Sequence, residues 1–296
     1  MQVSIIGLGR AAWIYDLENS SLRRSHTQSI QEVCGFEVVA GVDVSKVVAN
    51  AWSSHFGIPA FSDLEEMFGK FKPDLIVISV PITDLFNTLM RVLDFSGQAY
   101  ILIEKPVVSS IEQYLQLFSL QPEKKNRVIV NLPRLFATET FLLAKALYGQ
   151  ADPSIRISGF YSGSLLNTSL HFISLIDSLI PRLEWQPDNS NNYIISRQDS
   201  AKKHELGSIF HDPSLSVSTF DFRISGRQFL VDYRDGGGQI SLFLNERNLP
   251  IESTRNTYQK NVYEYISVNG IEKVVGISGL NKVLSSISGM IRSHER

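Results

Sequence analysis

Short runs of β-branched and other apolar residues alternate with longer segments of helical period over the first 130 residues. The run Leu75-Ile76-Val77-Ile78 is apolar throughout, which is typical of a strand covered on both faces of its sheet. Strands that alternate with helices predict βαβ units around a parallel sheet, and therefore a doubly wound α/β domain. We expect strands at Val3–Ile6, Glu37–Val42, Leu75–Val80, Tyr100–Ile103 and Val128–Leu132, and helices at Leu22–Cys34, Lys46–Phe56, Leu64–Phe68, Leu85–Leu93 and Ile111–Phe118.

The pattern changes after Pro133. A helical segment comes first, and period-2 alternation follows, which predicts an open, mainly antiparallel sheet in an α+β domain. We therefore expect two domains, residues 1–133 and 134–296. The expected elements are a helix at Thr138–Tyr148, strands at Val217–Ile224, Gln228–Tyr233 and Gln239–Leu244, a polar surface loop at Glu184–Ser200 and an amphipathic terminal helix from Leu280 to Ile291.

Composition and charge exclude several classes of protein. The formal net charge is -2 without a polybasic tract, so nucleic acid is not an expected partner. Cys34 is the single cysteine, which rules out an intrachain disulfide, and no Cys/His cluster has metal-ligand spacing. No apolar run approaches the ~20 residues that cross a bilayer, and the N-terminus lacks the pattern of a signal peptide. We expect a cytoplasmic protein without a metal or a membrane partner.

A glycine motif follows the first expected strand directly. Gly7-Leu8-Gly9-Arg10-Ala11-Ala12 matches G-x-G-x-x-A, in which the glycines permit a tight turn and close approach to a pyrophosphate, and Ala12 allows close helix packing. We expect the pyrophosphate on the amides that follow Gly7 and Gly9, at a helix N-terminus and helped by Arg10. The alternative is a tight turn in a doubly wound protein that binds no dinucleotide.

Asp43 ends the second expected strand, where a carboxylate would bind a ribose diol and repel a 2′-phosphate. This predicts NAD as the cofactor, with NADP disfavoured. Asp43 lies 36 residues after Gly7, further than the usual ~20, and we interpret the aromatic and charged stretch Trp13–Ser25 as an insertion. Trp13 and His26 belong to the residues of this region that could fold over a cofactor.

Two further groups carry candidate chemistry. Glu104-Lys105-Pro106 follows the strand Tyr100–Ile103, so Lys105 is expected at a carboxyl strand end, where its ammonium can polarise a substrate oxygen or exchange a proton. The alternative for Lys105 is a solvated loop lysine.

A polar stripe runs along an otherwise apolar helical segment, formed by Asn167, His171, Ser174 and Ser178. Such a stripe calls for a ligand or internal partners. A buried His171 satisfied by neighbouring hydroxyls is the alternative here.

Together these motifs resemble the glucose-fructose oxidoreductase, inositol 2-dehydrogenase and rhizopine-catabolism (Gfo/Idh/MocA) family. The resemblance implies a Rossmann domain followed by an open-sheet domain, with the lysine of Glu104-Lys105-Pro106 beside the hydride-transfer centre. In the family the later helix reads Asp-x-x-x-His-x-x-Asp; here His171 is kept, while Asn167 and Ser174 replace the two acids. The resemblance further implies that Pro81 and Glu104 border the cofactor and that Arg134, Asn167 and Ser174 border the substrate.

The leading hypothesis is an NAD-dependent oxidoreductase that transfers a hydride between nicotinamide and a secondary alcohol or ketone of a sugar, sugar-nucleotide or cyclitol. Lys105 and His171 are its expected catalytic residues. One alternative is a redox-neutral enzyme that reduces and reoxidises NAD within a turnover during glycoside cleavage. The other is a non-catalytic NAD-binding regulatory protein, which the two missing helix acids would explain. A homodimer or homotetramer through the C-terminal sheet is expected from the family and from aromatic residues along its strands.

Overall fold

The chain folds into two compact units in a computed structural model. Unit 1 comprises Met1–Pro133 and Asn256–Leu284, and unit 2 comprises Arg134–Arg255 and Ser285–Arg296. The structure describes all residues except 18–22, 148–153, 162–169, 181–182, 189–191, 199–202, 213, 216–218, 226–229, 237–238, 245–246, 250–256 and 285–296.

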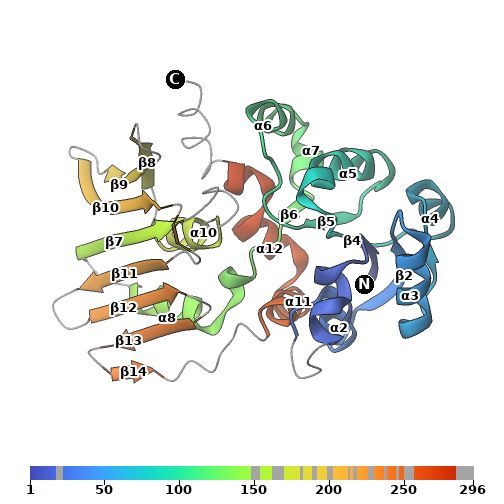
Figure 1. The fold of residues 1–296 in the computed structure, drawn as a ribbon, viewed down its shortest axis with the longest axis horizontal. Helices are drawn as coiled ribbons and strands as arrows, with labels where there is room; N and C mark the ends of the chain where they lie inside the picture. The colour runs from blue at the N-terminus through green and yellow to red at the C-terminus, as the bar shows by residue number, and fades with distance from the viewer. Residues whose placement is uncertain are drawn as a thin grey trace. The chain divides into compact units, whose positions relative to one another are not determined.

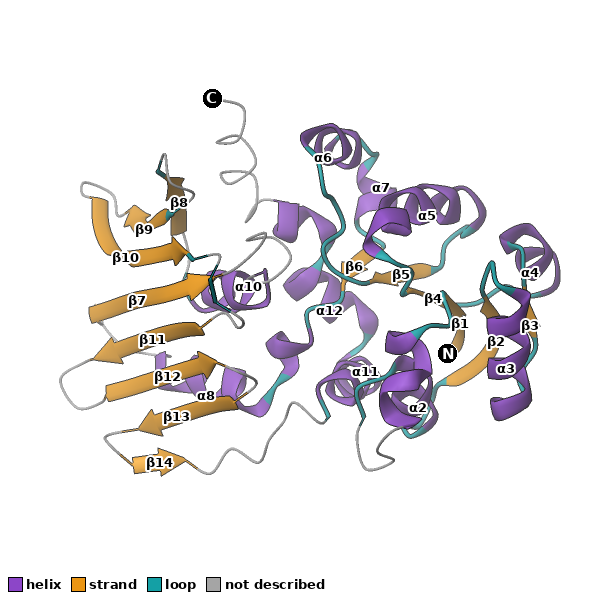
Figure 2. Ribbon diagram, in the orientation of Figure 1, coloured by secondary structure: helices purple, strands orange, loops and turns teal. Residues whose placement is uncertain are grey.

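Unit 1 is built on a parallel sheet of six strands in the order β3-β2-β1-β4-β5-β6 (Figure 1, with β1 and β3 labelled in Figure 2), the strand order of a Rossmann fold. The doubly wound domain predicted from the sequence is confirmed. The strands are β1 (Gln2–Ile6), β2 (Glu37–Val42), β3 (Ala60–Phe61), β4 (Leu75–Ile78), β5 (Tyr100–Ile103) and β6 (Val128–Val130). The helices are η1 (Arg10–Ile14), α1 (Tyr15–Leu17), α2 (His26–Gln31), α3 (Lys46–Phe56), α4 (Leu64–Lys70), α5 (Ile82–Phe95), α6 (Ile111–Phe118), α7 (Pro122–Lys125), α11 (Tyr258–Asn269) and α12 (Ile271–Ser278).

Local chemistry explains where several of these helices begin and end. The Ser45 hydroxyl accepts from the Val48 amide at the start of α3, and Gly57 ends this helix with a φ of 70°, in the left-handed region. Asp63 caps α4 by accepting from two backbone amides, those of Glu65 and Glu66. The short β3 was not predicted, because two residues are too few to show a period.

Residues 256–284 return to unit 1 late in the chain, whereas the sequence suggested one domain from 134 to the end. Helix α11 packs against α2, and α12 packs against β6 (Figure 1). Leu280, Val283 and Leu284 are buried, as an amphipathic terminal helix would require, while the rest of that predicted helix lies outside the described residues. This return matters for the site, because it brings α11 beside the residues that follow β5 and β6.

Unit 2 contains a mixed sheet of eight strands in the order β14-β13-β12-β11-β7-β10-β9-β8 (Figure 2). Every pairing is antiparallel except β7 with β10, which run parallel. The strands are β7 (Ser154–Tyr161), β8 (Leu183–Pro187), β9 (Tyr193–Gln198), β10 (Lys203–His211), β11 (Thr219–Ser225), β12 (Leu230–Gly236), β13 (Gln239–Leu244) and β14 (Arg247–Leu249). The helices are α8 (Thr138–Leu147) and α10 (Leu170–Leu179), and the 3-10 turn η2 (Pro133–Phe136) connects the units in sequence.

The polar stretch 184–200 does not form the surface loop that its composition indicated. It contributes β8 and β9 to the sheet, with Trp185, Tyr193 and Ile195 buried. The prediction was wrong because a strand needs apolar residues only at alternate positions, and the Asn and Ser residues between them hid the period.

Candidate active site

The carboxyl ends of the parallel strands place the predicted motifs along one edge of the unit 1 sheet. Gly7 follows β1, Asp43 follows β2, Ser79 follows β4, Glu104 follows β5, and Asn131 follows β6. In this strand order the connections reverse between β1 and β4, and open α/β sheets bind ligands beside that point. The sheet topology therefore gathers the candidate cofactor residues without further assumptions.

Gly7 occupies a position that admits no side chain. Its φ is 86°, and an added Cβ would lie 2.8 Å from the carbonyl carbon and oxygen of Ser79. The Ser79 hydroxyl donates to the Gly7 carbonyl oxygen at 2.8 Å, which ties the turn to the end of β4. Gly9 is different, because an added Cβ there would meet nothing within 4 Å. The turn thus presents open backbone at Gly9, which fits the close approach of a pyrophosphate.

Asp43 is joined to this turn directly. Its Oδ2 accepts from the Leu8 amide at 2.9 Å, and its Oδ1 accepts from the Ser45 amide at 2.9 Å. Two backbone donors therefore hold a partly exposed carboxylate beside the glycine turn. A carboxylate oxygen can accept more than one hydrogen bond, so the arrangement leaves Asp43 able to bind a ribose hydroxyl as well.

The stretch interpreted as an insertion begins inside a helix. Trp13 belongs to η1, where it is buried and donates from Nε1 to the Leu8 carbonyl at 2.7 Å. Ala12 is also buried, while Arg10 is exposed and lies over the ring of Tyr15, 5.3 Å from its centroid. Trp13 therefore stabilises the glycine turn through its hydrogen bond to Leu8, a role that the sequence did not reveal.

Glu104 and Lys105 stand at the end of β5 and are both partly exposed. Glu104 Oε1 accepts from Asn131 Nδ2 at 2.5 Å and lies 3.1 Å from His26 Nε2. Burial by itself would raise the pKa of the Glu104 carboxyl. The hydrogen bond and charge of His26, the hydrogen bond of Asn131 and the charge of Lys105 outweigh that effect and lower this pKa. The site thus carries an ionised carboxylate next to the candidate catalytic lysine.

Three residues that sequence reasoning did not assign to the site complete this cluster. Asn131 Nδ2 also donates to Gln259 Oε1 at 2.8 Å, and Tyr263 Oη lies 2.6 Å from His26 Nδ1. Asn131 had a usable signal, because it directly follows a buried strand next to β5. Gln259 and Tyr263 stand four residues apart on α11, so they share a helix face, but only the fold shows what that face contacts.

The other predicted residues belong to the segment between β4 and α5 or to unit 2. Pro81 is exposed and precedes the first residue of α5. In unit 2, Arg134 lies in η2, and α10 carries a half-buried His171 and a buried Ser174. Asn167 lies outside the described residues. Asp177, one turn further along α10, accepts from Trp185 Nε1 at 3.1 Å and so serves packing within unit 2.

Comparison with known proteins agrees with this geometry. Residues 1–132 match the Gfo/Idh/MocA family model, described as an oxidoreductase family with an NAD-binding Rossmann fold. No curated protein matches the sequence. Similar solved structures include the WlbA dehydrogenase from Bordetella pertussis in complex with NADH and UDP-GlcNAcA, at 17% identity and a TM-score of 0.65, covering 100% of this chain and 95% of that one.

Two other structures show the same fold. A putative myo-inositol dehydrogenase from Sinorhizobium meliloti matches at 13% identity and a TM-score of 0.67, over 100% of this chain and 98% of that one. A putative NADPH-dependent oxidoreductase from Desulfitobacterium hafniense matches at 12% identity and a TM-score of 0.69, over 99% and 95% of the two chains. At such identities the likeness shows the shared fold alone.

The fold and the edge of the unit 1 sheet define an oxidoreductase with an NAD-binding Rossmann domain. The match of residues 1–132 to the Gfo/Idh/MocA family model confirms the resemblance predicted from the sequence. None of the helices in the described ranges is long and apolar enough to cross a membrane.

Proposed function

We propose that this protein oxidises a secondary alcohol, or reduces the corresponding ketone, on a sugar, sugar-nucleotide or cyclitol, with NAD as the hydride carrier. The observation that carries the proposal is the common edge at which the Gly7 turn, Asp43 and Lys105 follow three strands of one parallel sheet. Oxidation removes a hydride from the carbinol carbon and a proton from its hydroxyl. When bound, nicotinamide supplies the hydride acceptor.

The chain's own residues account for the rest of the reaction. Lys105 Nζ takes the hydroxyl proton during oxidation and returns it during reduction. His171 assists as a second proton carrier, and Arg134, Asn167 and Ser174 bind substrate hydroxyls or charges. The Ser174 hydroxyl is buried and has no hydrogen-bond partner among the residues that the structure describes, which supports a ligand or solvent contact there.

The substrate class is proposed from two supports. Hydroxyl and amide side chains such as Ser174 and Asn167 suit polyhydroxylated ligands. The Bordetella protein of the same fold is described with a sugar-nucleotide, and the Sinorhizobium protein is described as a putative inositol dehydrogenase. A panel of sugars, cyclitols and sugar-nucleotides, each at about millimolar concentration and assayed for NADH formation by absorbance, tests the proposal. Tight NAD binding without turnover of any panel member would favour the regulatory alternative.

NAD rather than NADP is proposed as the cofactor, and Asp43→Asn tests this choice. An amide of the same shape removes the repulsion of a 2′-phosphate, so we expect the ratio of NADPH to NADH affinity to rise about tenfold. The variant also turns an amide NH₂ toward one of two backbone donors, and we expect it to lose about 1–3 kcal/mol of unfolding free energy. Fluorescence titration and thermal melting measure the two effects.

Asp63→Asn is the matched control for this variant. Asp63 also accepts from two backbone amides, at 2.8 and 3.0 Å, but it caps α4 and is exposed. Both hydrogen bonds end on Oδ1 of Asp63, so an asparagine keeps them, and we expect a smaller stability loss and an unchanged cofactor ratio. Equal NADH and NADPH affinities in the unaltered protein would contradict the choice of NAD.

We also propose a homodimer or homotetramer that uses the face of the unit 2 sheet on which Phe160 and Phe210 are exposed. Phe160 on β7 and Phe210 on β10 are 47% and 43% exposed, and their ring centroids lie 5.6 Å apart. Exposed paired aromatics on a sheet face are typical of a buried contact with another chain. Light scattering at about 20 µM should show an oligomer that Phe160→Lys dissociates, while Phe118→Lys, at a more exposed position on α6, has no effect. A monomeric unaltered protein would refute this.

A further inference from the structure

A series of hydrogen bonds runs from α11 through α2 to the carboxylate of Glu104, next to Lys105 in sequence. Tyr263 Oη lies 2.6 Å from His26 Nδ1, and His26 Nε2 lies 3.1 Å from Glu104 Oε1. Tyr263 is 0% exposed and His26 is 1% exposed, whereas the Glu104 side chain is 25% exposed. The series therefore begins in the interior of unit 1 and ends at the sheet edge that carries the candidate site.

The direction of each hydrogen bond follows from the groups involved. An ionised carboxylate only accepts, so His26 Nε2 donates to Glu104. When the imidazole is neutral, Nδ1 is the acceptor and the Tyr263 hydroxyl donates to it; when the imidazole is protonated, Nδ1 donates to Tyr263 Oη. Burial, followed by the charge of Glu104, raises the pKa of Tyr263 well above its ordinary value, so this hydroxyl keeps its proton. In both states Tyr263 occupies Nδ1 of His26 and leaves the Nε2 hydrogen for Glu104.

Groups from four elements face the Glu104 carboxylate. His26 comes from α2, Asn131 follows β6, and Lys105 is the next residue in the chain. Tyr263 on α11 lies close enough for the charge of Glu104 to raise its pKa. Among these, His26 makes the largest favourable contribution to the ionised state of Glu104. Loss of His26 would therefore leave burial as the dominant influence on the carboxyl group.

We propose that His26 and Tyr263 are positioning residues for Lys105, and that they act by holding an ionised Glu104 carboxylate in place beside it. The inference rests on the proposed role of Lys105 in proton transfer. A fixed anion next to an ammonium orients it, so the ionised carboxylate positions the group that exchanges the substrate proton. Without the anion, Lys105 would sample more orientations and transfer the proton less efficiently.

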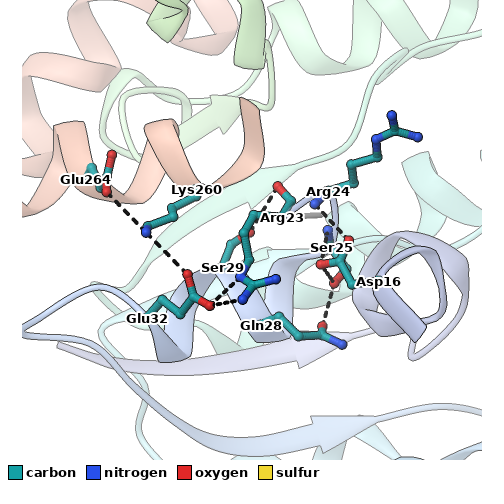
Figure 3. A network of polar contacts seen from close by, with 9 residues as sticks. All are labelled: Asp16, Arg23, Arg24, Ser25, Gln28, Ser29, Glu32, Lys260 and Glu264. Carbon is teal, nitrogen blue, oxygen red and sulfur yellow. Dashed lines mark hydrogen bonds and ion pairs between the residues drawn. The ribbon is translucent and has the colours of Figure 1, made fainter. Parts of the chain in front are cut away.

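The packing of α11 does not depend on the Tyr263–His26–Glu104 hydrogen bonds alone, so their effect can be separated from that of helix packing. Lys260 Nζ on α11 lies 3.2 Å from Glu32 Oε2 and 3.6 Å from Glu264 Oε1 (Figure 3). Arg23 also contacts Glu32 in the same network (Figure 3). These ion pairs lie at the surface, and they join α11 to the end of α2 without touching Glu104 or His26.

The test compares His26→Leu, His26→Gln and Tyr263→Phe, with Lys260→Ala as the control that weakens α11 docking at the surface only. His26→Gln keeps a side-chain N–H for Glu104, and Tyr263→Phe keeps the shape of the ring, so at least these two are expected to fold. The pH profile of kcat/KM is measured with the best substrate of the panel. The Glu104 carboxyl is titrated by ¹³C NMR on glutamate-labelled protein, with Glu104→Gln assigning the resonance.

In His26→Leu we expect the titration midpoint of Glu104 to rise by about one pH unit or more, because burial is no longer opposed by the histidine. The acid limb of kcat/KM should move upward with it, and kcat should fall about tenfold with KM changed less than about threefold. Tyr263→Phe should shift both quantities in the same direction by less. His26→Gln should restore most of the loss, and Lys260→Ala should match the unaltered protein.

An unchanged Glu104 midpoint in both His26→Leu and Tyr263→Phe would overturn the proposal, and so would a moved midpoint that leaves kcat and the acid limb unaltered. If no panel compound is oxidised, the proposed function fails by itself, and the NMR titration then decides whether His26 holds Glu104 ionised. Equal effects of Lys260→Ala and His26→Leu would assign the whole change to helix docking and refute a positioning role.

Discussion

Lys105→Met should bind NADH within about threefold of the unaltered protein and lose on the order of 10²-fold or more in turnover. Methionine keeps most of the length of the side chain and removes its amine, so the proton of the substrate hydroxyl no longer has an acceptor at the end of β5. The adenosine and pyrophosphate contacts depend on the Gly7 turn and Asp43, which this substitution does not touch. Stopped-flow or steady-state NADH formation, together with a fluorescence titration of NADH, measures both quantities.

Lys70→Met is the matched control, because Lys70 lies on α4 with 57% of its side chain exposed and pairs with Glu66 at the surface. It should leave turnover unchanged. His171→Ala is expected to cost less than Lys105→Met, since Asn167 cannot offset the charge of an imidazolium as an aspartate would. A Lys105→Met protein with normal turnover would remove the lysine from the proposed mechanism.

The second large effect is expected from Gly7→Ala, in the fold as well as in binding. A left-handed backbone costs an alanine about 1–2 kcal/mol, and forcing a methyl group into a filled space costs about 1–3 kcal/mol more. Both costs apply at Gly7, because its φ is 86° and an added Cβ would lie 2.8 Å from the Ser79 carbonyl. We expect a loss of about 2–5 kcal/mol in unfolding free energy and the loss of measurable NADH binding, because the turn must move away from β4.

Gly9→Ala separates the two consequences. Its φ is -87°, and its Cβ would meet no atom of the protein within 4 Å, so we expect a stability change within about 1 kcal/mol. NADH affinity should nevertheless fall, because the methyl group occupies the space that the proposed pyrophosphate needs. Denaturant unfolding and NADH titration of both variants check this contrast. Normal NADH binding by Gly9→Ala would contradict the proposed pyrophosphate position.

Much of the Rossmann unit was predictable because its strands are continuous apolar runs of ordinary length. Helices α3 and α6 and strand β5 have the predicted bounds, since capping residues and the apolar period agree there. The sheet of unit 2 was harder. Strands β8 and β9 were read as a loop, and β7 and β10 were not predicted, because alternation over a few half-polar residues is a weak signal.

For the site, the amino-acid sequence by itself determined the residues that follow each strand, and so placed Gly7, Asp43 and Lys105 at one sheet edge. This placement follows because the carboxyl ends of parallel strands lie at the same edge of a sheet. Only the tertiary structure decided that residues 256–284 return to unit 1, which joins His26 to Tyr263 across 237 residues and Asn131 to Gln259 across 128. Such contacts depend on which helix face packs against which strand end, and the hydrophobic period of a segment does not identify the element that it packs against.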